Sequence, residues 1–189
     1  MRDLGTFGGI ESLACGVNDT GQIVGFFSTF KNQWRAFLHD PNLGMRDLGP
    51  TEFGPAATCH INNQGFVVGQ FGSAQEDTCV STWTVGTGPR QLPLDGRDWV
   101  QVSALDDANH FFVNTHRRGF RWRGRRFWDQ TESYSWKSAT DVRCLNDQLG
   151  RTDIEGLAVT DVNKDGKMVG SLSIKRLPYP HAVFLEPIK

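Results

Sequence analysis

Short apolar runs, each following a turn rich in Asn, Asp and Gly, recur along the whole chain. They are Ile23-Val24-Gly25, Val67-Val68-Gly69, Phe111-Phe112-Val113 and Met168-Val169-Gly170. Short apolar runs bounded by turn-forming residues are typical of β-strands. We therefore expect an all-β fold without a long helix.

These runs belong to an internal repeat. The pentapeptide Met1-Arg2-Asp3-Leu4-Gly5 recurs unchanged 44 residues later as Met45-Arg46-Asp47-Leu48-Gly49, and a degenerate copy follows at Arg90-Gln91-Leu92-Pro93. A fixed period of this length indicates an array of similar structural units.

A second repeated segment precedes each apolar run, at residues 15–21, 59–65, 103–109 and 160–166. Its anchors Asn18, Asn62 and Asp106 are each 44 residues apart, and Asn163 follows after 57, so we expect the fourth unit to carry 13 extra residues. The turn slot three residues after each anchor holds Gly21, Gly65, Asn109 and Gly166. Gly and Asn enter left-handed backbone conformations most easily, and the anchor side chain can hydrogen-bond its own turn. The segment predicts a tight β-hairpin.

The strand before each turn has its own pattern. An apolar residue stands just before each anchor, and we expect it to face the core: Val17, Ile61, Leu105 and Val162. Two positions earlier each copy has a small residue, which suits a crowded innermost strand: Cys15, Cys59, Ser103 and Thr160.

Third strands are predicted at residues 34–38, 81–85, 119–122 and 181–185, and the Met-Arg-Asp-Leu-Gly segment supplies the fourth. Four short antiparallel strands about every 45 residues are typical of a propeller blade. We predict a small four-bladed β-propeller with units at 6–49, 50–93, 94–130 and 131–189. Residues 1–5 would supply the outer strand of the last blade and so close the ring.

Composition narrows the function. The formal net charge is −1, so no global field attracts nucleic acid or an anionic membrane. No apolar run reaches the roughly 20 residues needed to cross a bilayer, and no signal peptide is apparent, so we expect a cytoplasmic protein, or an extracellular one if a leader is removed. The four cysteines lack metal-ligand spacing and are expected to be free thiols.

The motif Asp3-Leu4-Gly5-Thr6-Phe7-Gly8-Gly9, with Val17-Asn18, Gly21 to Gly25 and Ala36-Phe37-Leu38, resembles the bacterial HAF repeat. The C-terminal segments Leu145-Asn146-Asp147, Val162-Asn163 and Phe184-Leu185-Glu186-Pro187 are similar to the final repeat of that family. The resemblance implies a β-propeller-like repeat, often extracellular, without general catalytic activity. The third unit departs from the pattern.

No catalytic motif stands out. Asp161-Val162-Asn163-Lys164-Asp165-Gly166 fits the start of a calcium loop, but Leu172 stands where an EF-hand needs a bidentate Glu. The five histidines show no metal-ligand pairing. We expect no metal, no cofactor and no enzymatic activity.

The candidate binding site is an Arg- and Trp-rich segment at residues 116–128. Its site residues are Arg117, Arg118, Arg121, Trp122, Arg123, Arg125, Arg126 and Trp128. Arg and Trp are enriched at interface hot spots, although an arginine-coated strand can also be a merely solvated face. In such a strand Arg121 and Arg123 would lie opposite Phe120 and Trp122.

The best-supported prediction is a monomeric, non-catalytic module that binds another protein, for which an acidic partner and an inhibitor or immunity-type role are candidates. Two alternatives stay open. One is an extracellular or surface glycan-binding propeller, and the other is single-stranded nucleic-acid binding through the Arg- and Trp-rich segment. The net charge counts against nucleic acid.

Overall fold

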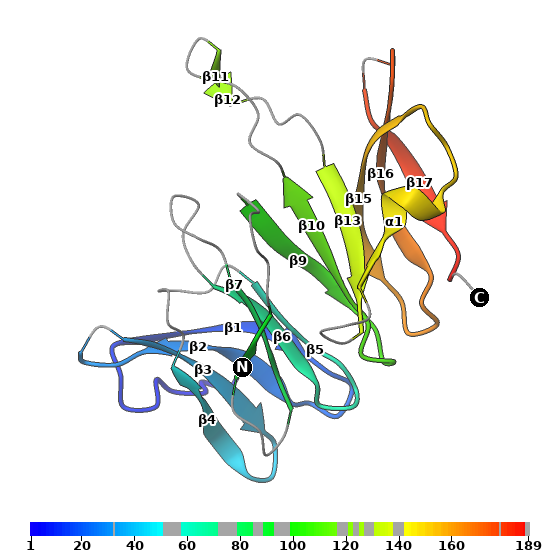
Figure 1. Ribbon diagram of the computed structural model, residues 1–189. Coiled ribbons are helices and arrows are strands. Elements are labelled where there is room, and N and C mark those ends of the chain that lie inside the picture. The colour runs from blue at the N-terminus through cyan, green and yellow to red at the C-terminus, as the bar shows by residue number, and fades with distance from the viewer. Residues whose placement is uncertain are drawn as a thin grey trace. The chain divides into compact units, whose positions relative to one another are not determined.

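The computed structural model describes residues 1–31, 33–50, 58–71, 79–84, 89–92, 99–116, 121–122, 125–126, 131–137, 142–177 and 179–187. As expected, the described chain is all-β, with four antiparallel sheets of three or four strands (Figure 1). The one helix among these residues is the single turn α1 (Leu145–Gln148), and none is long and apolar enough to cross a membrane. The chain divides into two compact units, Met1–Leu92 and Pro93–Lys189.

The first unit contains two four-stranded meanders. One consists of β1 (Glu11–Val17), β2 (Ile23–Ser28), β3 (Trp34–Asp40) and β4 (Gly44–Pro50) in that order. The other consists of β5 (Thr58–Ile61), β6 (Val67–Phe71), β7 (Cys79–Trp83) and β8 (Arg90–Gln91). The second pentapeptide copy lies in β4, as predicted, and the first two residues of the degenerate copy form β8.

The second unit contains the other two large sheets. The third sheet has the order β9 (Trp99–Leu105), β10 (Phe111–His116), β13 (Thr131–Trp136) and β14 (Val142–Cys144). The fourth has three strands, β15 (Ile154–Val162), β16 (Met168–Ile174) and β17 (His181–Leu185). Between β10 and β13 the strands β11 (Arg121–Trp122) and β12 (Arg125–Arg126) form a separate two-stranded sheet.

The predicted hairpin turn is confirmed in all four sheets. The anchor N–H and C=O close the turn at both ends; in the first copy Asn18 N donates to Gln22 O and Gly21 N donates to Asn18 O, each at 3.0 Å. The turn residues have the predicted left-handed φ angles: 78° at Gly21, 75° at Gly65, 64° at Asn109 and 77° at Gly166. The repeated segment therefore specifies the same hairpin turn in each of the four sheets.

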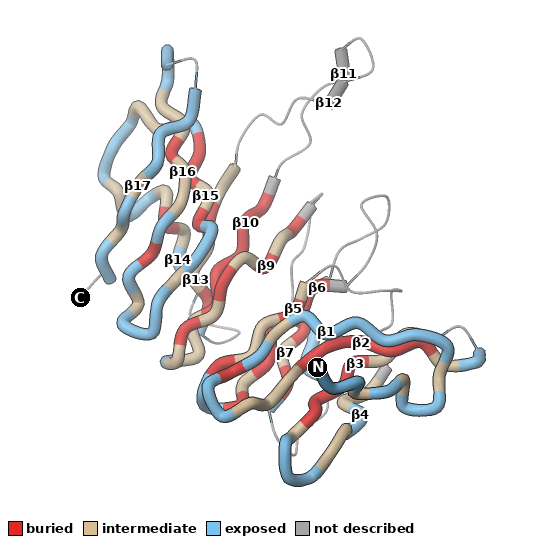
Figure 2. The backbone as a smooth tube through the Cα atoms, turned by 180° about the vertical axis from the view of Figure 1, so that it is seen from behind, coloured by how far each residue is buried: buried red, intermediate tan, exposed pale blue. Residues whose placement is uncertain are grey.

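The two sheets of each unit pack on each other through equivalent positions of the repeat. In the first unit Val24 and Leu38, an opposed pair on β2 and β3, share a core with Val67 and Trp83, an opposed pair on β6 and β7. In the second unit Phe112 of β10 packs with Met168 of β16, and these positions are equivalent to Val24 and Val67. Figure 2 shows the resulting buried stretches along β2, β3 and β10, whereas β1 and β17 are largely exposed.

The structure corrects the predicted role of the residues before each turn. The expected core-facing position fails at Val17, which is 66% exposed, but holds at Ile61 and Val162, which are half-buried and pack against the cores of their units. Leu105 is half-buried. Of the small residues, Cys15, Ser103 and Thr160 are each the extra residue of a β-bulge. A bulge redirects the side chains next to it, which accounts for the exposure of Val17 two residues after the bulge at Cys15. The buried residue is the anchor itself at Asn18, Asn62 and Asp106.

The third strand predicted at 119–122 is also wrong. The third strand of this sheet is β13, which pairs along its whole length with β10. Most of the extra residues thus lie between the second and third strands of the third sheet, before residue 131. β13 and β14 follow residue 130, where the sequence had suggested a unit boundary.

Residues 1–5, predicted to form the closing strand, do not form a strand in this structure, since residues 1–6 are irregular. The two pentapeptide copies nevertheless share a local turn. Gly5 N donates to Asp3 Oδ1 at 2.9 Å and Gly49 N donates to Asp47 Oδ1 at 2.8 Å. Closure of the ring by residues 1–5 stays a prediction.

Candidate functional site

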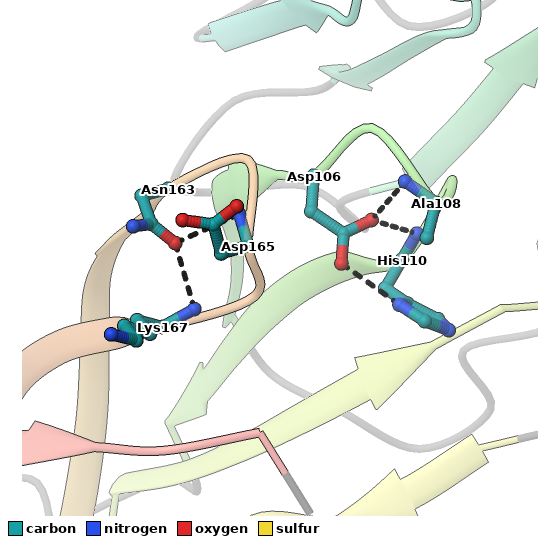
Figure 3. A network of polar contacts seen from close by, with 6 residues as sticks. All are labelled: Asp106, Ala108, His110, Asn163, Asp165 and Lys167. Carbon is teal, nitrogen blue, oxygen red and sulfur yellow. Dashed lines mark hydrogen bonds and ion pairs between the residues drawn. The ribbon is translucent and has the colours of Figure 1, made fainter.

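The turn between β9 and β10 carries a buried carboxylate. Asp106 is 5% exposed, and its Oδ1 accepts the N–H groups of Ala108 and His110 at 2.9 and 2.7 Å. Its Oδ2 lies 2.8 Å from Nδ1 of His110 (Figure 3). The carboxylate therefore holds the imidazole by one edge, and in the neutral ring Nδ1 donates to Asp106 while Nε2 becomes an acceptor.

The positions equivalent to Asp106 and His110 in the first turn carry amide side chains, Asn18 and Gln22. Asn18 Oδ1 accepts Gln22 N–H at 2.9 Å, and Asn18 Nδ2 donates both to Gln22 Oε1 at 2.9 Å and to Asn62 O, in the next sheet, at 3.0 Å. A carboxylate has no N–H to donate. The change to Asp106 thus keeps the turn but gives up the bond to the neighbouring sheet, and gains an oriented histidine.

A pocket opens beside this turn within the second unit. Its volume is about 330 Å³, at the lower end of the range for ligand pockets. Its floor is apolar and is formed by the buried residues Phe112, Leu145 and Met168, and the exposed Pro187 also lines the pocket. The turn of Gly166 forms one wall, because a Cβ added to Gly166 would lie 4.0 Å from Asp106 Oδ2. We call this the Asp106 pocket.

The rim of the Asp106 pocket is polar. It is formed by His110, Ser135, Lys137, Arg143 and Gln148, besides Asp106 itself. Lys137 follows β13, Arg143 lies in β14 and Gln148 in α1, and all three are exposed. The rim contains the basic side chains Lys137 and Arg143 and one carboxylate, Asp106, which is hydrogen-bonded to His110 and to two backbone N–H groups. The pocket thus offers a positive rim above an apolar floor.

These residues were not predicted as a site. Lys137, Arg143 and Gln148 lie in segments outside the repeated turn, so no spacing along the chain marks them as neighbours of His110. The available signal was Asp106, which stands where the other three turns have Asn18, Asn62 and Asn163. A departure from a repeat that loses a hydrogen bond is expected at functional positions.

The predicted Arg- and Trp-rich site is only partly within the described residues. Arg121 and Trp122 of β11 pair through the backbone with Arg126 and Arg125 of β12. Arg117, Arg118, Arg123 and Trp128 lie outside the described residues. The strands β11 and β12 thus lie between β10 and β13 along the chain, and the role of the Arg- and Trp-rich segment as a binding site stays a prediction.

The calcium-like motif forms the same turn as the other repeats. Asn163 Oδ1 accepts the N–H groups of Asp165 and Lys167 at 3.0 and 2.9 Å (Figure 3). Within the described part of the chain no three His, Cys, Asp or Glu side chains are grouped to hold a metal ion. The turn geometry accounts for the Asn and the Gly of this motif.

Comparison with known proteins adds no relative. No family model matches the chain, and no curated protein matches it significantly.

Proposed function

We propose that this chain is a non-catalytic binding module, built as a four-bladed β-propeller, that receives an acidic side chain of a partner protein in the Asp106 pocket. The observation that carries the proposal is the pocket itself, in which a cationic rim surrounds an apolar floor large enough for one anchoring residue and its neighbour.

The propeller is supported by the repeated packing of sheets. In both units the face that bears Val24 or Phe112 packs on the face of the next sheet that bears Val67 or Met168. The residue at the position of Val24 is buried in each of the first three sheets. Its equivalent in the fourth sheet, Val169, is 45% exposed. Its cross-strand partner Phe184 is 59% exposed. One further step of the same packing would cover this face with the first sheet and close a ring.

The class of ligand follows from charge and shape. Lys137 and Arg143 attract a carboxylate, and Arg binds carboxylates in a bidentate geometry. Phe112, Leu145 and Met168 are buried at the floor and favour an apolar side chain next to the acid. A protein segment with an acidic residue beside an apolar one fits both features.

The test uses two small peptides that differ in one charge. N-acetyl-Phe-Glu-amide and N-acetyl-Phe-Gln-amide are titrated into the ¹⁵N-labelled protein, and backbone amide shifts report the site and the Kd. We expect the Glu peptide to perturb residues around Asp106, Lys137 and Met168, with an affinity at least about 3-fold higher than that of the Gln peptide.

Charge variants identify the groups responsible. Lys137→Gln should weaken binding of the Glu peptide by about 2- to 5-fold, because an exposed ion pair contributes up to about 1 kcal/mol. Lys31→Gln, an equal change of charge in the first unit, should leave the Kd unchanged. Equal binding of the two peptides, or shifts confined to other residues, would overturn the proposal.

A further inference from the structure

Two cysteines from successive repeats meet in the first unit. Cys15 on β1 and Cys59 on β5 each stand three residues before an anchor asparagine. A Cβ added to Gly16 would lie 3.2 Å from the carbonyl oxygen of Cys59, so the two strands approach closely at this point. The two side chains lie close enough for each to shift the pKa of the other thiol.

The turns that follow hold the two strands in this register. Asn18 Nδ2 donates to Asn62 O at 3.0 Å, and Asn63 exchanges two hydrogen bonds with Asp19, each 2.9 Å long. These three bonds hold the ends of β1 and β5 together, so the fold itself keeps Cys15 and Cys59 near each other.

We propose that Cys15 and Cys59 form a peroxide-sensitive thiol pair, in which exposed Cys15 is oxidised first and buried Cys59 then closes a disulfide between the first two sheets. Cys15 is exposed and Cys59 is only 4% exposed. An oxidant in solution can therefore reach one sulfur and not the other, which sets the order of the two steps.

The electrostatics of the pair agree with this order. The side chain of Cys59 lowers the pKa of Cys15 and so favours its thiolate, which is the reactive form. The side chain of Cys15 and burial raise the pKa of Cys59 far above its ordinary value, so Cys59 stays a thiol. Once Cys15 becomes a neutral sulfenic acid, the thiolate that disfavoured ionisation of Cys59 is gone.

The chemistry balances with hydrogen peroxide as the only oxidant. The Cys15 thiolate attacks one peroxide oxygen, the O–O bond breaks, and sulfenic acid and hydroxide form, with a two-electron oxidation of the sulfur. The Cys59 sulfur then attacks the Cys15 sulfur, the S–O bond breaks, and the departing hydroxide takes the Cys59 proton to give water. Two thiols and one peroxide yield one disulfide and two waters.

The experiment treats the native protein with a small molar excess of hydrogen peroxide. Digestion by trypsin and by a protease that cleaves after Glu76 separates Cys59 from Cys79, and mass spectrometry then locates any cross-link. We expect a Cys15–Cys59 cross-linked peptide, loss of two thiols and full recovery with dithiothreitol. Cys15 should also be alkylated at least about 10-fold faster than Cys59 in the folded protein.

Two variants separate the steps. Cys15→Ser should protect Cys59 from peroxide, and Cys59→Ala should leave Cys15 as a sulfenic acid that dimedone traps. Cys144, a half-buried thiol of the second unit, serves as the internal control. Absence of the Cys15–Cys59 cross-link while Cys144 oxidises as fast as Cys15 would overturn the proposal.

Discussion

Asn114 and Ser133 join the two sheets of the second unit through buried hydrogen bonds. Asn114 Nδ2 donates to Val159 O at 2.8 Å, and Val159 N–H is 3.0 Å from Ser133 Oγ and 3.2 Å from Asn114 Oδ1. The Ser133 hydroxyl also lies 2.5 Å from Asn114 Oδ1 and 2.9 Å from Leu157 O. Both side chains are at most 4% exposed, so their polar atoms find hydrogen-bond partners within this buried network.

Replacing Asn114 by Leu should therefore destabilise the protein. Leu has a similar size but cannot donate to Val159 O, which would be left buried without its partner, and such a loss costs about 1–3 kcal/mol. The free energy of unfolding, measured with urea, reports the change. Asn42→Ala, at an exposed turn, is the control and should change stability by less than about 0.5 kcal/mol. A result for Asn114→Leu as small as that of the control would contradict this account.

At the scale of elements, the sequence predicted what local chemistry determines. The four hairpin turns followed from Asn, Asp and Gly, because these residues specify their own backbone geometry. Strand β13 was missed, since its buried positions include Ser133 and so show no apolar alternation. Its burial makes sense only with Asn114 and Leu157 in place, which no local pattern reveals. The Asp106 pocket was missed for the same reason, because its rim combines residues from separate segments.

The bulges are a second feature that depends on more than one strand. At the bulge of β9 the hydroxyl of Ser103 donates to Phe112 O at 3.3 Å, and at the bulge of β15 the hydroxyl of Thr160 donates to Val169 O at 3.1 Å. Phe112 and Val169 occupy equivalent positions in their sheets. A small residue with a donor therefore bonds a carbonyl of the partner strand, which gives a reason for Ser and Thr at a position first interpreted as packing.

This interpretation predicts different results for two substitutions of Thr160. Thr160→Val keeps the shape but loses the donor to Val169 O, and should lower the free energy of unfolding by about 0.5–1.5 kcal/mol. Thr160→Ser keeps the hydroxyl and should lie closer to the wild type. Urea unfolding of the three proteins measures both effects. Equal stability of the Val and Ser variants would show that the hydroxyl has no role at the bulge.

At the scale of the whole molecule, the fourth sheet has an exposed apolar face. Val169 and Phe184 lie opposite each other on β16 and β17, and both are exposed. Their equivalents in the first sheet, Val24 and Leu38, are 1% and 5% exposed in the core with the second sheet. An apolar pair of this kind on a solvent-facing sheet is unfavourable, so a closed ring would bury surface that the repeat pattern assigns to the interior.

Phe184→Ala tests ring closure directly. In a closed propeller Phe184 is part of a core between the last and first sheets, and its loss should cost about 3 kcal/mol or more. On an open face the same substitution should change stability by less than about 0.5 kcal/mol. Leu38→Ala, at the equivalent and buried position of the first sheet, sets the scale for a core loss of about 2–5 kcal/mol. Tyr179→Ala, at a side chain that is 78% exposed, sets the scale for a surface change. Urea unfolding places Phe184 between these references, and a value that matches Tyr179→Ala would mean that the four sheets do not close into a ring.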